Sequence, residues 1–184
     1  MFRFRHRRFD GGMSGLRTWE VVRRGHAVAV LLYDPQADAL VMMEQFRLPA
    51  LAAGLDPVMV EIPAGFRDGM EGIEAALARE TREEVGLEAD RLAKIGDFVL
   101  SPGGSDELVT IFAGRVRAPA AGPDGLAGIG GLAHEHEDIR VRVWPADTAI
   151  AAVMAGEIPN SVTALALLWF ALRRQDLRKE WMES

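Results

Sequence analysis

The chain has 184 residues, of which 49% are hydrophobic, and this combination allows one domain with a sizeable core and excludes intrinsic disorder. Its formal net charge of −6 argues against nucleic-acid binding through the whole surface, and its lack of cysteine excludes a disulfide scaffold and thiol chemistry. The N-terminus has no apolar signal segment and the longest apolar run, residues 162–172, is too short to span a bilayer, so we expect a cytoplasmic protein without membrane or nucleic-acid partners.

The first 24 residues are expected to form a β-ribbon, followed by a single domain over residues 25–184. The ribbon is predicted from FRFRHRRF, which alternates with period two, and from the β-rich WEVVRR. Next come HAVAVLLYD and ALVMMEQFR, two apolar segments whose connecting turn predicts a hairpin. A further strand, VMVEIP, should end at Pro63.

A helix is predicted over residues 72–85, closed by Gly86 as a left-handed cap. Three strands should follow, in LAKIGDFVL, ELVTIFAGRVR and EDIRVRVW. The long segment before the last of them, residues 118–136, is rich in Gly, Ala and Pro without periodicity, and we expect it to be a loop. Two helices close the chain, one with Pro145 in its first turn and an amphipathic one with Ser161 as its N-cap.

The helix over residues 72–85 carries glutamates on the face that it should bury. At about 100° per residue, Ile73, Ala76 and Leu77 form an apolar stripe, and Glu80 and Glu84 continue that stripe. A solvated charged face, the alternative, would place the glutamates opposite the stripe. Inward carboxylates that repel each other are costly unless something pairs with them, and a hard cation such as Mg²⁺ takes oxygen ligands. The pattern therefore indicates a cation site.

Residues 65–87 resemble the Nudix box, GX5EX7REUXEEXGU, in which U is a bulky apolar residue. Gly65, Glu71 and the run RETREEVGL at 79–87 match the box, and only Thr81 departs from it, by a residue that keeps a β-branched methyl group. The resemblance implies the Nudix fold, a mixed β-sheet sandwiched between helices (class α/β, or α+β). It also implies hydrolysis of a nucleoside diphosphate linked to another moiety.

The same resemblance implies the roles of the box residues. The metal shell would consist of three helix carboxylates and one backbone carbonyl, from Glu80, Glu83, Glu84 and Ala64. Arg79 and Glu71 would form an ion pair that orients the helix for catalysis, and Glu83 would hold a metal ion or its water. The implied cofactor is Mg²⁺, or Mn²⁺, with more than one ion per site.

Five further segments resemble the ADP-ribose pyrophosphatase branch of this family: RGHAVAVLL, EQFR, EIPAGF, SPGGSDE and HEHEDIRV. The resemblance implies substrate contacts from Arg47, Phe66, Pro102, Gly103 and Gly104, although SPGG alone reads as a tight turn and Arg47 alone as a surface arginine. Arg24 and Glu61 are weaker candidates of the same kind. The implied reaction converts ADP-ribose to AMP and ribose 5-phosphate. Other nucleoside diphosphate sugars, such as GDP-mannose, and a non-catalytic nucleotide sensor are the alternatives.

The segment HEHED places Glu135 and Glu137 before the last strand. From the residues alone, this segment is interpreted either as a solvated loop or as a zinc site formed by His134 and His136. The resemblance implies that Glu137 holds metal and Glu135 is the base that orients or deprotonates water, with the two roles open to exchange. Glycines between 122 and 131 would let this loop swing over the site.

The N-terminal ribbon is expected to build a homodimer. Phe2, Phe4 and Phe9 need a partner surface, and the arginines beside them suit the outer face of a shared ribbon better than a nucleic-acid patch. Relatives in this branch carry more residues upstream, including an aromatic side chain that stacks on adenine. In this chain Trp19 is the candidate for such stacking, with a packed core tryptophan as the alternative.

Overall fold

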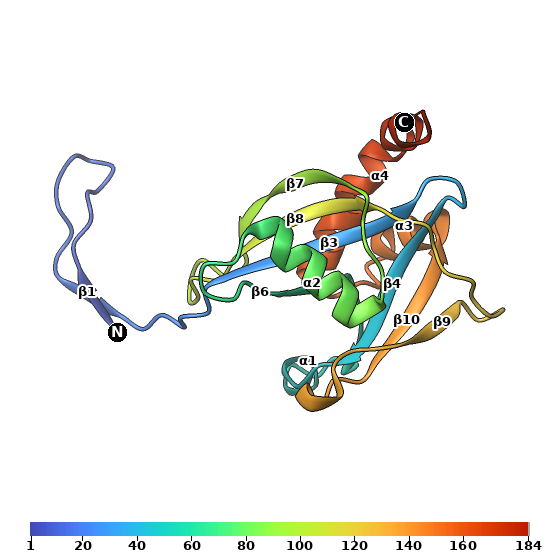
Figure 1. Cartoon of the computed structure of the whole chain (residues 1–184). Helices are drawn as coiled ribbons and strands as arrows, with labels where there is room; N and C mark the ends of the chain where they lie inside the picture. The colour runs from blue at the N-terminus through green and yellow to red at the C-terminus, as the bar shows by residue number, and fades with distance from the viewer. Residues whose placement is uncertain (184) are drawn as a thin grey trace.

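The computed structural model describes residues 1–183, and its centre is an eight-stranded mixed sheet (Figure 1). The strands are β3 (His26–Asp34), β4 (Ala39–Phe46), β5 (Val58–Glu61), β6 (Ala64–Phe66), β7 (Arg91–Val99), β8 (Leu108–Arg115), β9 (Leu126–Gly130) and β10 (Ile139–Pro145). The main path runs β7-β8-β3-β4-β10-β9; β3 and β8 are parallel and the other pairs are antiparallel. The predicted strands and the hairpin of β3 and β4 are confirmed.

Helices cover both faces of the sheet, which confirms the expected fold class (Figure 1). They are α1 (Leu48–Ala52), α2 (Ile73–Val85), α3 (Ala146–Met154) and α4 (Ser161–Met182). Helix α2 lies on one face, whereas α3 and α4 pack together on the other (Figure 1). None of the helices within residues 1–183 is long and apolar enough to cross a membrane.

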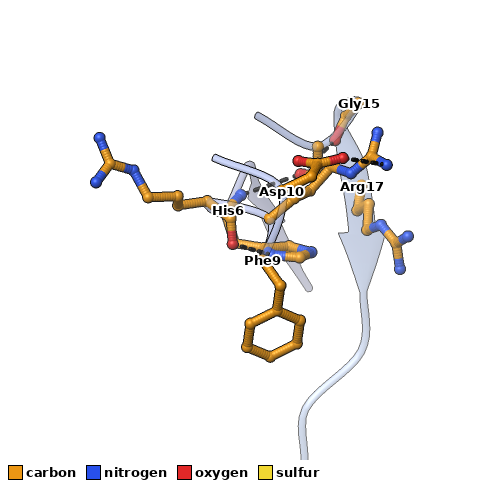
Figure 2. A pocket seen from close by; sticks show the side chains of 8 residues that line it. His6, Phe9, Asp10, Gly15 and Arg17 are labelled. Carbon is orange, nitrogen blue, oxygen red and sulfur yellow. Dashed lines mark hydrogen bonds and ion pairs between the residues drawn. The ribbon is translucent and has the colours of Figure 1, made fainter. Parts of the chain in front are cut away.

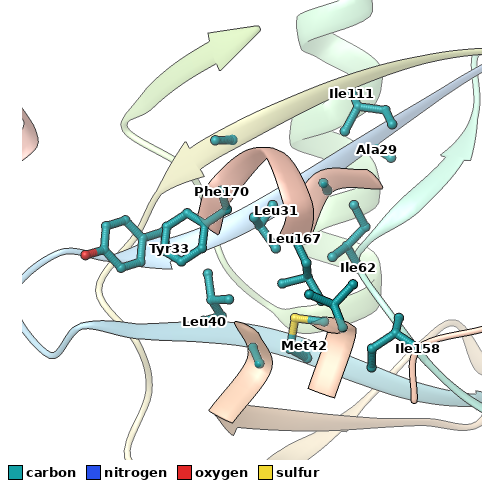
Figure 3. Packing of buried hydrophobic residues seen from close by; sticks show 14 of the residues in the cluster. Ala29, Leu31, Tyr33, Leu40, Met42, Ile62, Ile111, Ile158, Leu167 and Phe170 are labelled. Carbon is teal, nitrogen blue, oxygen red and sulfur yellow. The ribbon is translucent and has the colours of Figure 1, made fainter. Parts of the chain in front are cut away.

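The sheet has a hydrophobic core on each of its two faces. Strand β3 contributes to both cores because its side chains alternate between the two faces. Leu31 and Tyr33 point into the core under α3 and α4, where Phe170 packs edge-on against Tyr33 with ring centroids 4.8 Å apart (Figure 3). Val30 and Leu32 point into the core under α2. Because β3 is buried on both faces, its side chains pack against the helices on either side of the sheet. Those on one face hold α2 in position.

Strands β3 and β4 separate at one end, and this separation makes room for the site. They pair only through Leu32–Asp34 of β3 and Ala39–Val41 of β4. Beyond that point β6 pairs with β3 and β5 pairs with β4. Strands β5 and β6 belong to one continuous segment, which crosses from β4 to β3. The end of β5 and the start of β6 therefore both lie at the opening between β3 and β4.

Helix α2 has the boundaries that the sequence predicts, and Gly86 closes it with a φ of 69°. Ala76 and Leu77 are buried in the core, as the apolar stripe requires. Thr81, the one departure from the motif, is buried as well, and its hydroxyl donates to the Leu77 carbonyl at 2.6 Å. The substitution therefore leaves no unpaired polar group in the core.

The loop expected over residues 118–136 was wrong in part, because β9 lies within it. Strand β9 pairs antiparallel with β10 through the backbone, a contact that side-chain periodicity does not record. Its glycines let it approach α2: a Cβ on Gly130 would lie 1.8 Å from the Glu84 carbonyl oxygen, and Gly131 N donates to the Glu83 carbonyl at 3.0 Å. These two glycines therefore let the segment pack directly against α2.

Two further differences concern short elements and a helix cap. The sequence did not predict α1 or β6, which have five and three residues and no period of their own. Ser161 was expected to cap α4, but Asn160 does so: its side-chain oxygen accepts from Thr163 N at 2.9 Å. Pro145 likewise precedes α3 as its N-cap rather than lying in its first turn.

The N-terminal segment forms a separate two-stranded ribbon that extends away from the domain (Figure 1). Strand β1 (Phe2–Phe4) covers only the start of FRFRHRRF. Strand β2 (Arg17–Trp19) ends at the first residue of WEVVRR, so the strand predicted there was largely wrong. Between them lies a cavity of about 670 Å³ lined by exposed basic side chains and Phe9 (Figure 2). Its one acidic side chain, Asp10, pairs with Arg8 at 2.6 Å, so this cavity offers no free carboxylate for a cation.

We expect this ribbon to join two copies of the chain. Phe9, Met13 and Trp19 are all exposed on it, and apolar side chains on a projecting ribbon gain free energy when a partner covers them. Light scattering at micromolar concentration should therefore give twice the chain mass of 20.1 kDa. The variant Phe9→Ser/Trp19→Ser should shift the mass toward the monomer, while Leu172→Ser, which removes an exposed leucine of α4, should not. A wild-type monomer under these conditions would remove the prediction.

Candidate active site

Helix α2 presents a graded row of carboxylates to the opening between β3 and β4. Glu84 is 3% exposed, and the exposed side-chain fractions of Glu80 and Glu83 are 13% and 29%. Ala64 N, at the start of β6, donates to Glu84 Oε2 at 2.8 Å. The glutamates thus lie on the inward continuation of the apolar stripe, where the helical projection placed them.

The burial of these carboxylates is poorly compensated in the protein without a cation. The pKa of Glu84 is raised to about 8, chiefly by burial and also by the charges of Glu80 and Glu137, although the hydrogen bond from Ala64 lowers it. Burial also raises the pKa of Glu80, although Arg79 lowers it. Burial and mutual repulsion disfavour the ionised form of these carboxylates, and a divalent cation bound beside them would favour it.

Arg79 organises the exposed side of this row. A guanidinium has five N–H donors, and those of Arg79 reach the two carboxylate oxygens of Glu71 at 3.2 and 3.1 Å and the Phe66 carbonyl at 3.0 Å. The remaining contacts go to Glu80 Oε1 at 2.7 Å and Glu83 Oε2 at 3.2 Å. The structure therefore pairs Arg79 with Glu71, and it adds that the same arginine holds two of the helix carboxylates.

Gly65 faces Glu80 so closely that a side chain at this position would displace the Glu80 carboxylate. A Cβ at this position would lie 2.0 Å from Glu80 Cδ and Oε1, inside the carboxylate. The glycine therefore keeps the Glu80 carboxylate in place where β6 approaches α2, and its backbone angles do not demand it.

The segment before β10 brings the two other expected glutamates to the same place. Glu137 Oε2 accepts from Leu132 N at 3.1 Å, and its charge acts on both Glu80 and Glu84. Glu135 has 57% of its side chain exposed, with His134 Nε2 at 3.7 Å. Glu137 is thus the fixed member of the pair and Glu135 the free one.

No three His, Cys, Asp or Glu side chains within residues 1–183 are assembled closely enough to hold a metal ion. The zinc site considered for His134 and His136 therefore has no support in the described chain. The carboxylates of α2 are likewise not assembled into such a group in the described residues.

A cavity of about 620 Å³ opens over these carboxylates. Of the residues expected at the site, it is lined by Arg47, Ala64, Phe66, Arg79, Glu80, Glu84, Glu135, Glu137 and the weaker candidates Arg24 and Glu61. Glu71 and Glu83 do not line the cavity and reach it through Arg79. The cavity is large enough for a nucleotide-sized ligand.

Four expected substrate contacts lie outside this cavity: Pro102, Gly103, Gly104 and Trp19. Gly104 accepts a hydrogen bond from Val22 N at 2.8 Å, so the SPGG turn holds the segment that leads out of the ribbon. Trp19 lies edge-on to Phe4 with ring centroids 5.1 Å apart, and its ring is half exposed rather than packed in the core. Within one copy of the chain, Trp19 is therefore not part of the cavity.

Sequence reasoning missed Asn160, which holds Glu61, the partner of Arg47. Arg47 donates from Nε and Nη2 to Glu61 Oε2 at 2.9 and 2.6 Å, and Asn160 Nδ2 donates to Glu61 Oε1 at 2.7 Å. Asn160 is also the N-cap of α4, and a cap residue before an apolar helix was the signal that could have identified it. The arginine at the cavity is thus tied to the start of the last helix.

Arg24 and Phe66 form a flat surface at the cavity mouth. The guanidinium of Arg24 lies 4.9 Å from the centroid of the Phe66 ring, and Arg24 Nε lies 3.4 Å from Glu107 Oε2. Glu107 lines the cavity although the sequence did not point to it. A guanidinium stacked on an aromatic ring suits contact with a planar or anionic group.

Inward helix carboxylates beside a glycine that admits them, on a mixed sheet between helices, are the structural form of the Nudix box. A family model described as NUDIX domain matches residues 23–161. The chain belongs to the Nudix family.

Relatives with assigned activities cover nearly the whole chain. The ADP-ribose pyrophosphatase of Escherichia coli (strain K12) is 40% identical over 181 residues, which is 98% of this chain and 84% of that protein. The GDP-mannose pyrophosphatase of Yersinia pestis (strain Pestoides F) is 34% identical over 159 residues, covering 86% of this chain and 77% of the relative. A crystal structure of an ADP compounds hydrolase matches with a TM-score of 0.66 at 17% identity, over 96% of this chain and 86% of that one, and supports the fold.

Proposed function

We propose that this chain hydrolyses the pyrophosphate of ADP-ribose to AMP and ribose 5-phosphate. The observation that carries the proposal is the row of inward carboxylates on α2, with the uncompensated Glu84 at its buried end, facing a cavity of about 620 Å³. The likeness to an ADP-ribose pyrophosphatase at 40% identity supports this choice of substrate.

ADP-ribose pyrophosphatases of this family use divalent metal ions, and the donor set of this site fits them. The proposed ligands are all oxygen donors: the Ala64 carbonyl, Glu80, Glu83, Glu84 and Glu137. We propose Mg²⁺, with Mn²⁺ as a substitute and more than one ion per site, because several carboxylates line this cavity. When bound, such ions neutralise phosphate oxygens and lower the pKa of a bound water molecule.

The chain's own groups supply positioning and proton transfer. Water attacks one phosphorus of the pyrophosphate, the bridging P–O bond breaks, and a proton of the water passes to the Glu135 carboxylate, which is exposed at the cavity. Arg47, held by Glu61, is placed to meet a phosphate, and the surface of Arg24 and Phe66 to meet the base or a ribose. Release of AMP and ribose 5-phosphate completes the reaction.

GDP-mannose is the second candidate substrate because a GDP-mannose pyrophosphatase is 34% identical over most of the chain. Both substrates share the pyrophosphate that the carboxylate row would serve. They differ in base and sugar, which would contact the other walls of the cavity. A sensor without catalysis would have no use for the inward carboxylates, all of which are present.

A screen of nucleoside diphosphate sugars with Mg²⁺, in which released phosphomonoesters are measured, tests the proposal. We expect ADP-ribose to give the highest kcat/KM, by about tenfold or more over GDP-mannose, since a site that binds one base through hydrogen bonds discriminates against another at this level. Chelation of the cation should abolish cleavage. A preference for GDP-mannose would exchange the candidates, and ligand-induced stabilisation without cleavage would favour a sensor.

A further inference from the structure

A chain of polar contacts runs from strand β7 to the loop that precedes α2. Thr110 Oγ1 on β8 lies 2.7 Å from Asp97 Oδ1 on β7 and 2.7 Å from His26 Nε2 on β3. His26 Nδ1 in turn lies 3.2 Å from Nη1 of Arg67, in the loop after β6. None of these four side chains lines the cavity, and Thr110 is fully buried.

Each of these four side chains has one possible hydrogen-bonding role. Lys94, and then Thr110, lower the pKa of Asp97, so its carboxylate only accepts. The single hydroxyl proton of Thr110 therefore goes to Asp97, and the hydroxyl oxygen accepts from His26 Nε2–H. His26 is thus the tautomer with a lone pair on Nδ1, and that lone pair accepts from the Arg67 guanidinium, which has only donors.

Arg67 connects these polar contacts to the loop of the Nudix box. Its Nε donates to the Glu71 carbonyl at 2.9 Å, its Nη2 donates to the same oxygen, and its backbone N–H donates to the His26 carbonyl at 3.0 Å. Asp68 and Glu71 also bond to each other, but those contacts stay within the loop. The Arg67 guanidinium is what ties the backbone at Glu71 to the side chain of β3.

We propose that His26 and Arg67 are positioning residues, which hold Glu71 so that its carboxylate meets Arg79. This inference rests on the proposed function. Arg79 binds Glu71 with two contacts and uses its others on Phe66, Glu80 and Glu83. If the backbone at Glu71 moves, Arg79 loses its anchor, and the carboxylates of α2 lose the arrangement in which a cation meets them.

Two amide substitutions of His26 separate the ends of the contact chain. In His26→Asn, the side-chain oxygen takes the place of Nδ1 and still accepts from Arg67, while the contact with Thr110 is lost. In His26→Gln, the longer side chain reaches Thr110 but leaves no acceptor beside Arg67. Arg67→Met removes the guanidinium itself and serves as a second route to the same loss.

We expect His26→Gln and Arg67→Met to weaken Mn²⁺ binding by about tenfold, as removal of an outer partner of ligating carboxylates does, and His26→Asn to stay within about twofold of wild type. Binding is followed by the electron paramagnetic resonance of free Mn²⁺. Hydrogen exchange of the amides of residues 68–72 in the cation-free protein should speed up in the same two variants. With ADP-ribose and Mg²⁺, kcat should fall in them by a larger factor than KM rises, because the contacts that are lost bear on the carboxylates and not on Arg47.

Equal effects of His26→Asn and His26→Gln would overturn the proposal, since a merely structural histidine would be disturbed alike by both. So would unchanged Mn²⁺ affinity and exchange in His26→Gln and Arg67→Met. Melting temperatures identify a variant that fails to fold. If either His26→Gln or Arg67→Met fails to fold, the other of these two variants decides. If the wild type cleaves no nucleotide sugar, the proposed function fails, while the exchange and Mn²⁺ measurements still decide the role of His26 and Arg67.

Discussion

Glu84→Gln and Glu83→Gln should each fold normally and lose turnover by several orders of magnitude. Glutamine at 84 keeps an oxygen that accepts from Ala64 N, so the contact at 2.8 Å survives, but it removes one negative charge from the proposed metal ligands. Glu74→Gln is the matched control, since Glu74 lies on the exposed side of the same helix. Wild-type turnover of both variants at saturating Mg²⁺ would contradict the assignment of these residues as ligands.

The same substitution changes the stability of the cation-free protein in a defined direction. The folded-state pKa of Glu84 is raised from 4.5 to about 8, so the folded protein binds this proton more tightly than the unfolded chain does. The stability that the protonated Glu84 side chain contributes to the folded state is fully present below about pH 4.5, and it is lost as the pH rises toward 8. Melting temperatures with a chelator should therefore fall over this range in wild type and fall less in Glu84→Gln. Added Mg²⁺ should restore stability to the wild type and much less to the variant.

The second large effect separates the two glutamates before β10. Glu135→Gln should lower turnover by about 10²-fold or more, the usual contribution of a general base, with little change in the Mg²⁺ concentration for half-maximal activity. Glu137→Gln should instead raise that concentration. The structure favours this division because Glu137 is fixed by Leu132 N and its charge acts on Glu80 and Glu84, whereas Glu135 is exposed.

Rate against Mg²⁺ concentration for both variants decides between the assignments. Asp138→Asn provides the control, because it removes one charge from the same segment at an exposed position outside the cavity. Reversed behaviour would exchange the roles of Glu135 and Glu137. Full activity in both variants would place the base elsewhere and leave this segment an ordinary connection.

The sequence predicted those parts of the fold in which side chains repeat with the period of the element. The apolar run of β3 and the stripe of α2 are of this kind, and the same projection turned Glu80 and Glu84 inward. Strand β9 was missed because its evidence is a backbone ladder and the close approach of Gly130 to α2, neither of which leaves a periodic pattern.

The walls of the cavity were less predictable than its carboxylates. Asn160 meets Glu61 across 99 positions of sequence, and Glu107 meets Arg24 only because β8 runs beside β3. Such contacts depend on strand order, which the segments do not specify individually. Pro102, Gly103, Gly104 and Trp19 came from resemblance alone, and the geometry of one chain does not bring them into the cavity.

The separation of β3 from β4 has a consequence for how the molecule folds. The segment that fills the gap, β5 and β6, carries Glu61 at one end of its connection and Ala64 at the other. Completing the sheet and delivering these two groups are therefore coupled, and the bond from Ala64 N to Glu84 couples both to the docking of α2. The hairpin of β3 and β4 involves near neighbours in sequence and can form early, whereas the pairing of β3 with β8 closes a long loop. A chain with the hairpin alone would have neither a complete sheet nor a carboxylate row at the opening, so the site requires the long-range pairings of the sheet.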